Sequence, residues 1–102
     1  MSITIATDLI QELAEYIDKR AVRADYTIGG QTYQAGLRRS IVNGTTIRKH
    51  VYLTQKDPYG TVTRCRLIGH DGKVIATRTD QKVHEVGKGL LLEFRFEISQ
   101  GV

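Results

Sequence analysis

The stretch GLLLEFRFEIS, Gly89 to Ser99, carries the clearest strand signal in the sequence. Its alternate apolar residues, from Leu90 to Ile98, would share one face of a strand, because successive side chains point to opposite sides. Such strict alternation is typical of a half-buried strand in an antiparallel sheet. We therefore expect residues 89–99 to form the central strand of a β-rich core.

Turn signals upstream divide the chain into further strands. Glycines between β-branched or aromatic runs favour hairpin turns, because glycine adopts a positive φ without steric cost. A type I turn is expected where Asp57-Pro58-Tyr59-Gly60 separates the strand that ends near Thr54 from residue 61. Hairpins are expected at Gly29-Gly30 in YTIGGQTYQ (26–34), at Asn43-Gly44 in RRSIVNGTTIRKHVYLT (38–54) and at Asp71-Gly72 between TVTRCRLI (61–68) and KVIATR (73–78).

One residue interrupts the pattern of the strand that follows Asn43-Gly44. Ile47, Val51 and Leu53 would share its apolar face, but Lys49 falls on that face too. A charge in this position predicts that the strand lies at a sheet edge or has a solvated end.

An amphipathic helix is expected before the strands, from about residue 7 to 23. Apolar residues repeat there every three to four positions, with acids and Lys19 on the other side. Thr7 or Asp8 is the expected N-cap. We expect the apolar stripe to pack on a sheet; the alternative is that it pairs with a helix of another copy. The stripe comprises Leu9, Ile10, Leu13, Tyr16, Ile17 and Ala21.

Together these elements predict an α+β fold. The N-terminal helix, about residues 7–23, is followed over residues 26–99 by about six or seven mainly antiparallel strands that form a β-sandwich or barrel-like body. The chain has 102 residues, of which 40% are hydrophobic and 25% charged, so size and composition favour one globular domain, 1–102.

The sequence also sets expectations for the compartment. Cys65 is the only cysteine, which excludes an intramolecular disulfide and suits a reducing environment. Asp8, Glu12 and Glu15 interrupt the N-terminal apolar residues, unlike a secretory signal, and no run approaches the roughly 20 apolar residues of a membrane span. We expect a soluble, cytoplasmic chain without a membrane partner.

The net charge of +4 is unevenly distributed. Residues 36–84 hold ten Lys and Arg against three Asp, whereas the first 35 residues hold three basic and five acidic residues. This asymmetry predicts either an anion-attracting surface or a contact between the acidic part of one copy and the basic part of another.

No residue pattern points to catalysis, a cofactor or a metal. His50, His70 and His84 lie in separate segments without the close spacing of a metal site. Cys65 stands between two arginines, but strand neighbours face opposite sides, so a small buried thiol is the favoured interpretation. No phosphate-binding glycine loop or nucleophile motif is present. We predict a protein that is not an enzyme, with no catalytic, cofactor-binding or metal residues.

A small basic β-barrel that binds nucleic acid is the alternative function. Barrels of the oligonucleotide-binding type combine a basic groove with aromatic side chains that stack on bases. The aromatic residues of this chain do not interleave with the basic ones in a binding motif, which makes this the second choice. The candidate residues are Arg38, Arg39, Arg48, Lys49, Arg64 and Arg66 with Tyr33, Tyr52 and Tyr59.

The order of segments from about residue 26 to 99 resembles β-rich modules of bacteriophage and prophage tail proteins, particularly the N-terminal, baseplate-proximal region of tail fibres. The first part of the resemblance is TTIRKHVYLTQKDPYGTVTRCRLIGHDGKVIATR (45–78), with a strand, a turn, a second strand and an Asp-Gly hairpin. The connection DQKVHEVGKG (80–89) and the final strand LLLEFRFEIS (90–99) complete it. The helix at residues 7–23 departs from the pattern, and a fibre shaft and tip are absent from the sequence.

The resemblance implies a virion structural protein without an active site, a small tail, baseplate or connector component rather than a whole fibre. Its partners would be further copies of itself and other phage structural proteins. It would be made in the cytoplasm of the host bacterium and then assembled into the virion.

Overall fold

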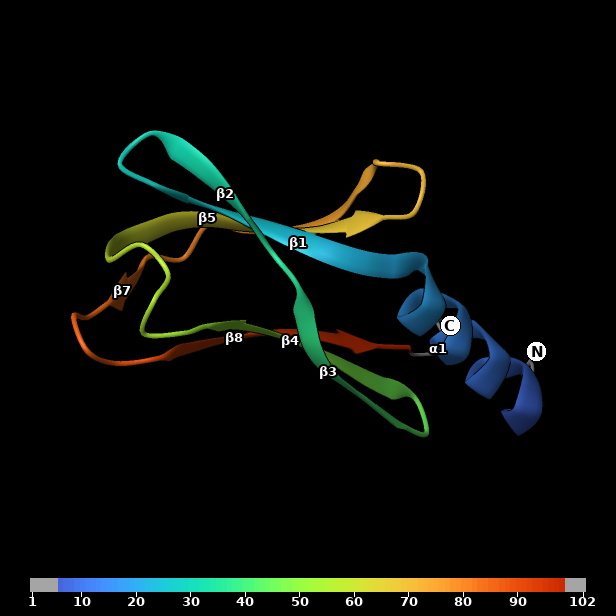
Figure 1. Cartoon of the computed structure of the whole chain (residues 1–102). Helices are drawn as coiled ribbons and strands as arrows, with labels where there is room; N and C mark the ends of the chain where they lie inside the picture. The colour runs from blue at the N-terminus through green and yellow to red at the C-terminus, as the bar shows by residue number, and fades with distance from the viewer. Residues whose placement is uncertain (1–5, 99–102) are drawn as a thin grey trace.

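One helix leads into eight strands in the structure, a computed structural model that describes residues 6–98 (Figure 1). The strand that was not expected is the short segment Lys82–His84, which pairs with the start of a longer strand. The elements are α1 (Thr7–Arg20), β1 (Ala21–Ile28), β2 (Gln31–Ala35), β3 (Leu37–Asn43), β4 (Thr46–Leu53), β5 (Gly60–Gly69), β6 (Val74–Arg78), β7 (Lys82–His84) and β8 (Leu90–Glu97).

The strands form two antiparallel sheets that lie one above the other (Figure 1). Sheet A has the order β2-β1-β5-β6. The short strand β7 also pairs with β5, at residues 60–62, whereas β6 pairs with residues 65–68 of β5. Sheet B has the order β3-β4-β8. The expected α+β fold is confirmed, and because neither sheet closes on itself the β body is an open sandwich and not a barrel.

The core lies between the inner faces of the two sheets. Tyr26 and Leu67 of sheet A belong to one buried cluster with Val51 and Leu92 of sheet B. Burying such a side chain stabilises the fold by roughly 1.5–3 kcal/mol relative to exposure, so the seam between the sheets holds the two layers together. The cluster also contains Ala21, Ala24, Leu53, Val62, Cys65 and Phe94.

The chain changes sheets at Gly36, the single residue between β2 and β3. In Figure 1 these two strands follow one another as a nearly continuous ribbon that crosses from one layer to the other. Sequence periodicity does not reveal such a crossing, because both strands keep their alternation on either side of it.

The three hairpins form at the predicted turns. Gly30 (φ 79°), Gly44 (φ 60°) and Gly72 (φ 81°) hold the positive φ that these turns require. The N–H of Gly72 also donates to the carbonyl oxygen of Gly69 at 2.9 Å, which closes the turn between β5 and β6. The strand pairs β1–β2, β3–β4 and β5–β6 are therefore confirmed.

The chain returns from sheet B to sheet A through a turn at residues 54–57. The N–H of Asp57 donates to the carbonyl oxygen of Thr54 at 3.1 Å, and the Asp57 carboxylate accepts the N–H of Thr54 at 2.6 Å. The prediction of a type I turn at Asp57-Pro58-Tyr59-Gly60 was wrong, because Asp57 closes the preceding turn with its side chain instead of opening the next one.

The final strand lies at an edge of sheet B and β4 lies at its centre. The alternating burial expected for β8 is present, but the predicted central position was wrong, because an edge strand can bury one face just as a central strand does. The prediction that Lys49 marks an edge or a wet end was also wrong. Lys49 is only 3% exposed in the central strand.

The helix ends at Arg20, three residues earlier than expected. Ala21 is already extended (φ −86°, ψ 113°) and pairs with Gly69 as the first residue of β1. Arg20 donates to both carboxylate oxygens of Asp71 at 2.8 Å, which ties the helix end to the β5–β6 turn. This hydrogen-bonded pair holds the pKa of Asp71 below its ordinary value. The strand pairing and the ion pair together end the helix.

The helix begins at Thr7, as predicted, but its N-cap differs from the predicted one. Ala6 occupies the N-cap position and no side chain caps the helix, so the assignment of Thr7 or Asp8 as N-cap was wrong. Asp8 lies in the first turn, where its charge interacts favourably with the helix dipole.

Candidate functional site

One surface of the molecule combines charged, aromatic and hydrogen-bonding side chains. Along β4 the residues at 46, 48, 50 and 52 face outward, because those at 47, 49, 51 and 53 are buried. Neighbouring side chains of β3 and β8 complete the surface. We call it the outer face of sheet B, and it consists of Arg38, Ile41, Asn43, Thr46, Arg48, His50, Tyr52, Leu91, Glu93, Arg95 and Glu97.

One end of this face groups an aromatic ring with ionisable side chains. The guanidinium carbon of Arg38 lies 5.5 Å from the centre of the Tyr52 ring, a cation–π contact. Nε2 of His50 lies 2.7 Å from Oε2 of Glu93 on the paired strand. That hydrogen bond is the main cause that holds the pKa of Glu93 below its ordinary value. Arg38, His50, Tyr52 and Leu91 surround an open depression of about 390 Å³.

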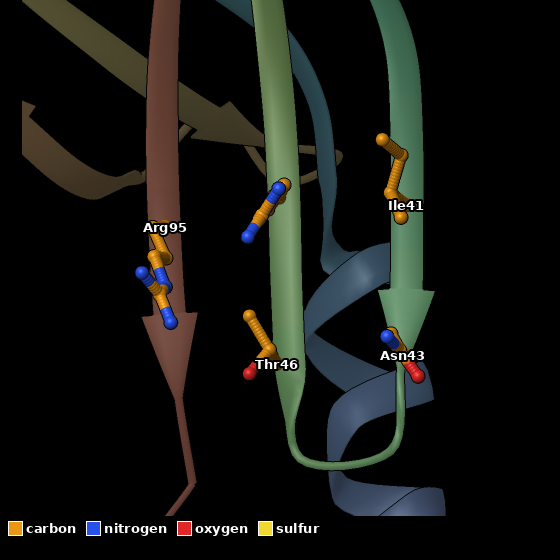
Figure 2. A pocket seen from close by; sticks show the side chains of 5 residues that line it. Ile41, Asn43, Thr46 and Arg95 are labelled. Atoms are coloured by element: carbon orange, nitrogen blue, oxygen red, sulfur yellow. The ribbon is translucent and has the colours of Figure 1, made fainter.

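The other end of the face holds two arginines in register. Arg48 of β4 is the direct cross-strand partner of Arg95 on β8. Together with Ile41, Asn43 and Thr46 they line a shallow depression of about 270 Å³. Figure 2 shows that this lining comes from three adjacent strands and that α1 lies behind them. The lining therefore offers positive charge and polar groups, and it contains no carboxylate.

Lys49 faces the opposite side of β4, toward α1. Its Nζ donates to the carbonyl oxygen of Asp18 at 2.7 Å, to Oδ1 of Asp18 at 2.8 Å and to Oγ of Ser40 at 2.8 Å. Burial acts to raise the pKa of Asp18, but the hydrogen bonds from Lys49 and Ser40 outweigh it and hold that pKa below its ordinary value. Because all three N–H groups of Lys49 are used, this residue anchors the helix and is not free to bind a ligand.

Arg64 and Arg66 lie on sheet A, on the face away from the core. Arg66 forms two hydrogen bonds, of 2.8 and 2.6 Å, with the carboxylate of its cross-strand partner Asp25. Arg64 donates to Oγ1 of Thr32 at 3.5 Å. The basic residues nominated from the sequence are therefore divided between two faces and the interior, and the side chain of Arg39 lies outside the described part of the structure.

The nominated tyrosines are divided as well. Tyr33 packs against Tyr26 with 5.5 Å between ring centres, and Tyr59 packs against His84 with 5.0 Å. Of the three nominated tyrosines, Tyr52 alone lies on the outer face of sheet B. The nominated residues thus do not gather into one groove, and Arg38, Arg48 and Tyr52 are the ones that share a surface.

The three histidines lie apart from one another. His84 is 1% exposed, with Nδ1 at 2.7 Å from the carbonyl oxygen of Pro58 and Nε2 at 2.7 Å from that of Lys88. His70 is exposed in the β5–β6 turn. Within residues 6–98, no three His, Cys, Asp or Glu side chains are grouped to hold a metal.

Cys65 is buried between the sheets, as expected for a small apolar residue. Burial raises the pKa of its thiol to about 11. Since the thiolate is the reactive form, such a thiol is a poor nucleophile near neutral pH.

The helix buries only part of its apolar stripe. Ala14 is fully buried and Ile17 is half-buried, whereas Leu9, Leu13 and Tyr16 remain 49%, 48% and 63% exposed. Residues three and four apart share one side of a helix, so these three form a continuous apolar surface. We call Leu9, Leu13 and Tyr16 the exposed helix strip. The expectation that the stripe packs on a sheet therefore holds for only part of it.

No protein-family model, curated protein or solved structure matches this chain. In the described range, residues 6–98, no helix is long and apolar enough to cross a membrane. The surfaces described above are the basis for assigning a function.

Sequence reasoning missed the pairing of Arg95 with Arg48. The alternation around Phe94 predicts that Arg95 points away from the core. Its position opposite Arg48, however, depends on which strand pairs with β8, and a single sequence does not contain that information. Which part of the apolar stripe stays exposed could not be predicted, because such a stripe looks the same in the sequence whether its own sheet covers all of it or half.

Proposed function

We propose that this protein is a non-enzymatic assembly protein that forms homo-oligomers and works through protein–protein contacts. The exposed helix strip carries the proposal. α1 already packs on its own sheets through Ala14 and through the bonds of Lys49 to Asp18, so the strip is not needed for folding. Contiguous exposed apolar side chains are characteristic of surfaces that bind another protein.

A second copy of the chain is the partner that the charge distribution favours. Asp8, Glu12 and Glu15 are exposed on α1 beside the strip. Residues 36–84, in contrast, hold ten Lys and Arg against three Asp. Opposite charge on two surfaces of one chain steers the helix of one copy toward the β body of the next. Contact between two different surfaces is heterologous, and it builds rings or filaments.

Strand addition at β8 fits less well than contact through the helix. Nη1 of Arg78 donates to the carbonyl oxygen of Glu93 in this edge strand at 2.7 Å. Asp80 holds the same guanidinium through two further hydrogen bonds. A charged side chain bound to an edge carbonyl hinders pairing with another strand.

Within the same proposal, the assembly is a phage or prophage tail, baseplate or connector. The support for this part is the resemblance of residues 26–99 to tail modules in the order of strands and turns. The protein would act in the cytoplasm of a host bacterium and then in the virion. Terminase, portal or tape-measure genes beside its own gene are the expected genomic context, and their absence would contradict this part.

Size-exclusion chromatography with light scattering tests the assembly role. We expect a mass that rises with protein concentration toward a defined oligomer. A mass equal to that of one chain at every concentration would contradict the proposal.

Nucleic-acid binding is the second candidate function, and one observation favours it. Arg38 stacks over Tyr52 on an open sheet face that also carries Arg48, and stacked aromatic and basic side chains are a surface on which single strands bind. Titration with single-stranded and duplex oligonucleotides over a salt series tests this role. A binder should weaken steeply as salt rises, whereas binding that is absent at low salt would exclude it.

A further inference from the structure

We propose that Arg48 and Arg95 form a binding site for a doubly charged oxyanion of the phosphate class, either free phosphate or the terminal phosphate of a small monoester. The site is the depression of about 270 Å³ at one end of the outer face of sheet B (Figure 2). It goes beyond the assembly role and does not depend on it.

The register of sheet B is the first argument. Arg48 and Arg95 are direct cross-strand partners, so their Cβ atoms are about 5 Å apart on the same face. Like charges in this position destabilise a sheet. An anion between two such guanidinium groups converts the repulsion into two charge-assisted hydrogen-bonded contacts.

The weak pairing of the two arginines with the carboxylates of Glu93 and Glu97, which flank Arg95 on the same face, is the second argument. Within residues 6–98, Arg48 forms no ion pair, and the acid nearest to Arg95 is Glu97, at the long distance of 4.0 Å. Glu93, on the same face, is hydrogen-bonded to His50 at 2.7 Å, and attraction to the more distant charges of Arg48 and Arg95 also helps to lower its pKa. The positive charge of the two arginines is therefore incompletely matched by the protein itself.

The remaining lining suits an oxyanion. Thr46 supplies a hydroxyl group and Asn43 an amide, and both can donate to an oxygen atom. In Figure 2 the side chains of Asn43, Thr46 and Arg95 lie on the same face of the sheet, each on a different stretch of strand. An arginine presents its donors as a planar fork that matches two oxygens of one phosphate group.

Charge selects the ligand class. Two guanidinium groups balance a phosphate dianion, whereas the phosphodiester of a nucleic acid carries one negative charge per group. The depression is shallow and open, so the ligand is held by its phosphate group rather than by enclosure of a large organic part.

Titration of the full chain with inorganic phosphate tests the site. In amide NMR spectra we expect saturable shifts at residues 43–48 and 93–95. Arg48→Gln and Arg95→Gln should each weaken binding about tenfold or more, the effect of losing one charged hydrogen-bonding group. Lys73→Gln, which removes an exposed charge in the β5–β6 turn, should leave the affinity unchanged.

Thermal unfolding gives an independent readout. Phosphate should raise the midpoint of the wild type and leave that of Arg48→Gln nearly unchanged, since a ligand stabilises only the fold that binds it. Without phosphate, Arg48→Gln should unfold at the same temperature as the wild type or higher, because a like-charge contact is removed. Equal phosphate affinity in wild type and both arginine variants would overturn the proposal. Tighter binding of an oligonucleotide without a terminal phosphate than of phosphate itself would overturn the choice of ligand.

Discussion

Nζ of Lys49 lies 2.8 Å from Oδ1 of Asp18 and joins the central strand of sheet B to the second half of α1. The Lys49 side chain is 4% exposed and that of Asp18 is 29% exposed. Removing one partner of such a pair leaves the other charge poorly solvated and unpaired. The loss of folding free energy is then larger than the contribution of the pair itself. The position of α1, and with it the exposed helix strip, depends on this contact.

Lys49→Met is predicted to destabilise the fold by about 2–4 kcal/mol, because Asp18 loses its main partner. Urea unfolding followed by circular dichroism measures the change. The matched control is Lys73→Met, which removes an exposed lysine and should change stability by no more than about 0.5 kcal/mol. The double variant Lys49→Met, Asp18→Leu should recover most of the loss. Equal stability of Lys49→Met and Lys73→Met would show that Lys49 does not anchor the helix.

Stability is predicted to fall above pH 9. Burial raises the pKa of the Cys65 thiol from 9.0 to about 11 and that of Tyr26 from 10.0 to about 12. Because both folded-state values exceed the unfolded ones, the stability linked to these groups is complete below pH 9 and is lost as the pH rises through 11 and 12. The part due to Cys65 is about 3 kcal/mol. Urea unfolding of the wild type and of Cys65→Ala between pH 8 and 11 measures this loss. The free energy of unfolding should fall less steeply with pH in the variant. Equal slopes in the two proteins would contradict the prediction.

The acid side is predicted to depend on Asp80. Two hydrogen bonds from Arg78 are the main cause that lowers the pKa of Asp80 from 3.8 to about 2. Since the folded-state value lies below the unfolded one, the linked stability is present above pH 3.8 and is lost as the pH falls toward 2. Asp80→Asn should flatten the acid end of the stability curve, and Arg78→Gln should do the same. If neither variant alters the curve, the pair does not exist in solution.

His84→Phe is predicted to cost about 1–3 kcal/mol, because an aromatic ring is kept but the carbonyl oxygens of Pro58 and Lys88 lose their contacts with the ring nitrogens. His70→Phe is the matched control, since His70 is exposed, and it should change stability by less than about 0.5 kcal/mol. Chemical unfolding of both variants makes the comparison. A His84→Phe variant as stable as the control would mean that the ring is not bonded on both sides.

Local chemistry explains which parts of the fold the sequence predicts. Asn43-Gly44 and Asp71-Gly72 specify their hairpins within a few residues, because glycine is needed where φ is positive. The alternation of β8 likewise shows which of its faces is buried. These features depend only on neighbours along the chain.

The parts that could not be predicted depend on pairing between distant segments. Neither the edge position of β8 nor the opposition of Arg48 and Arg95 follows from a pattern within one strand. Lys49 was misread because a lysine on an apolar face suggests solvent, whereas its partner Asp18 lies 31 residues away on the helix. A buried charge is predictable only when its partner is known.

Replacement of Leu13 within the exposed helix strip tests the assembly role most directly. Light scattering over a range of concentrations should show that the wild type self-associates and that Leu13→Lys weakens this association about tenfold or more. Val86→Lys is the matched control, because Val86 is 77% exposed and lies in the connection between β7 and β8. Circular dichroism should show the same fold in all three proteins. A monomeric wild type, or an oligomer that Leu13→Lys affects no more than Val86→Lys does, would contradict assembly through the helix.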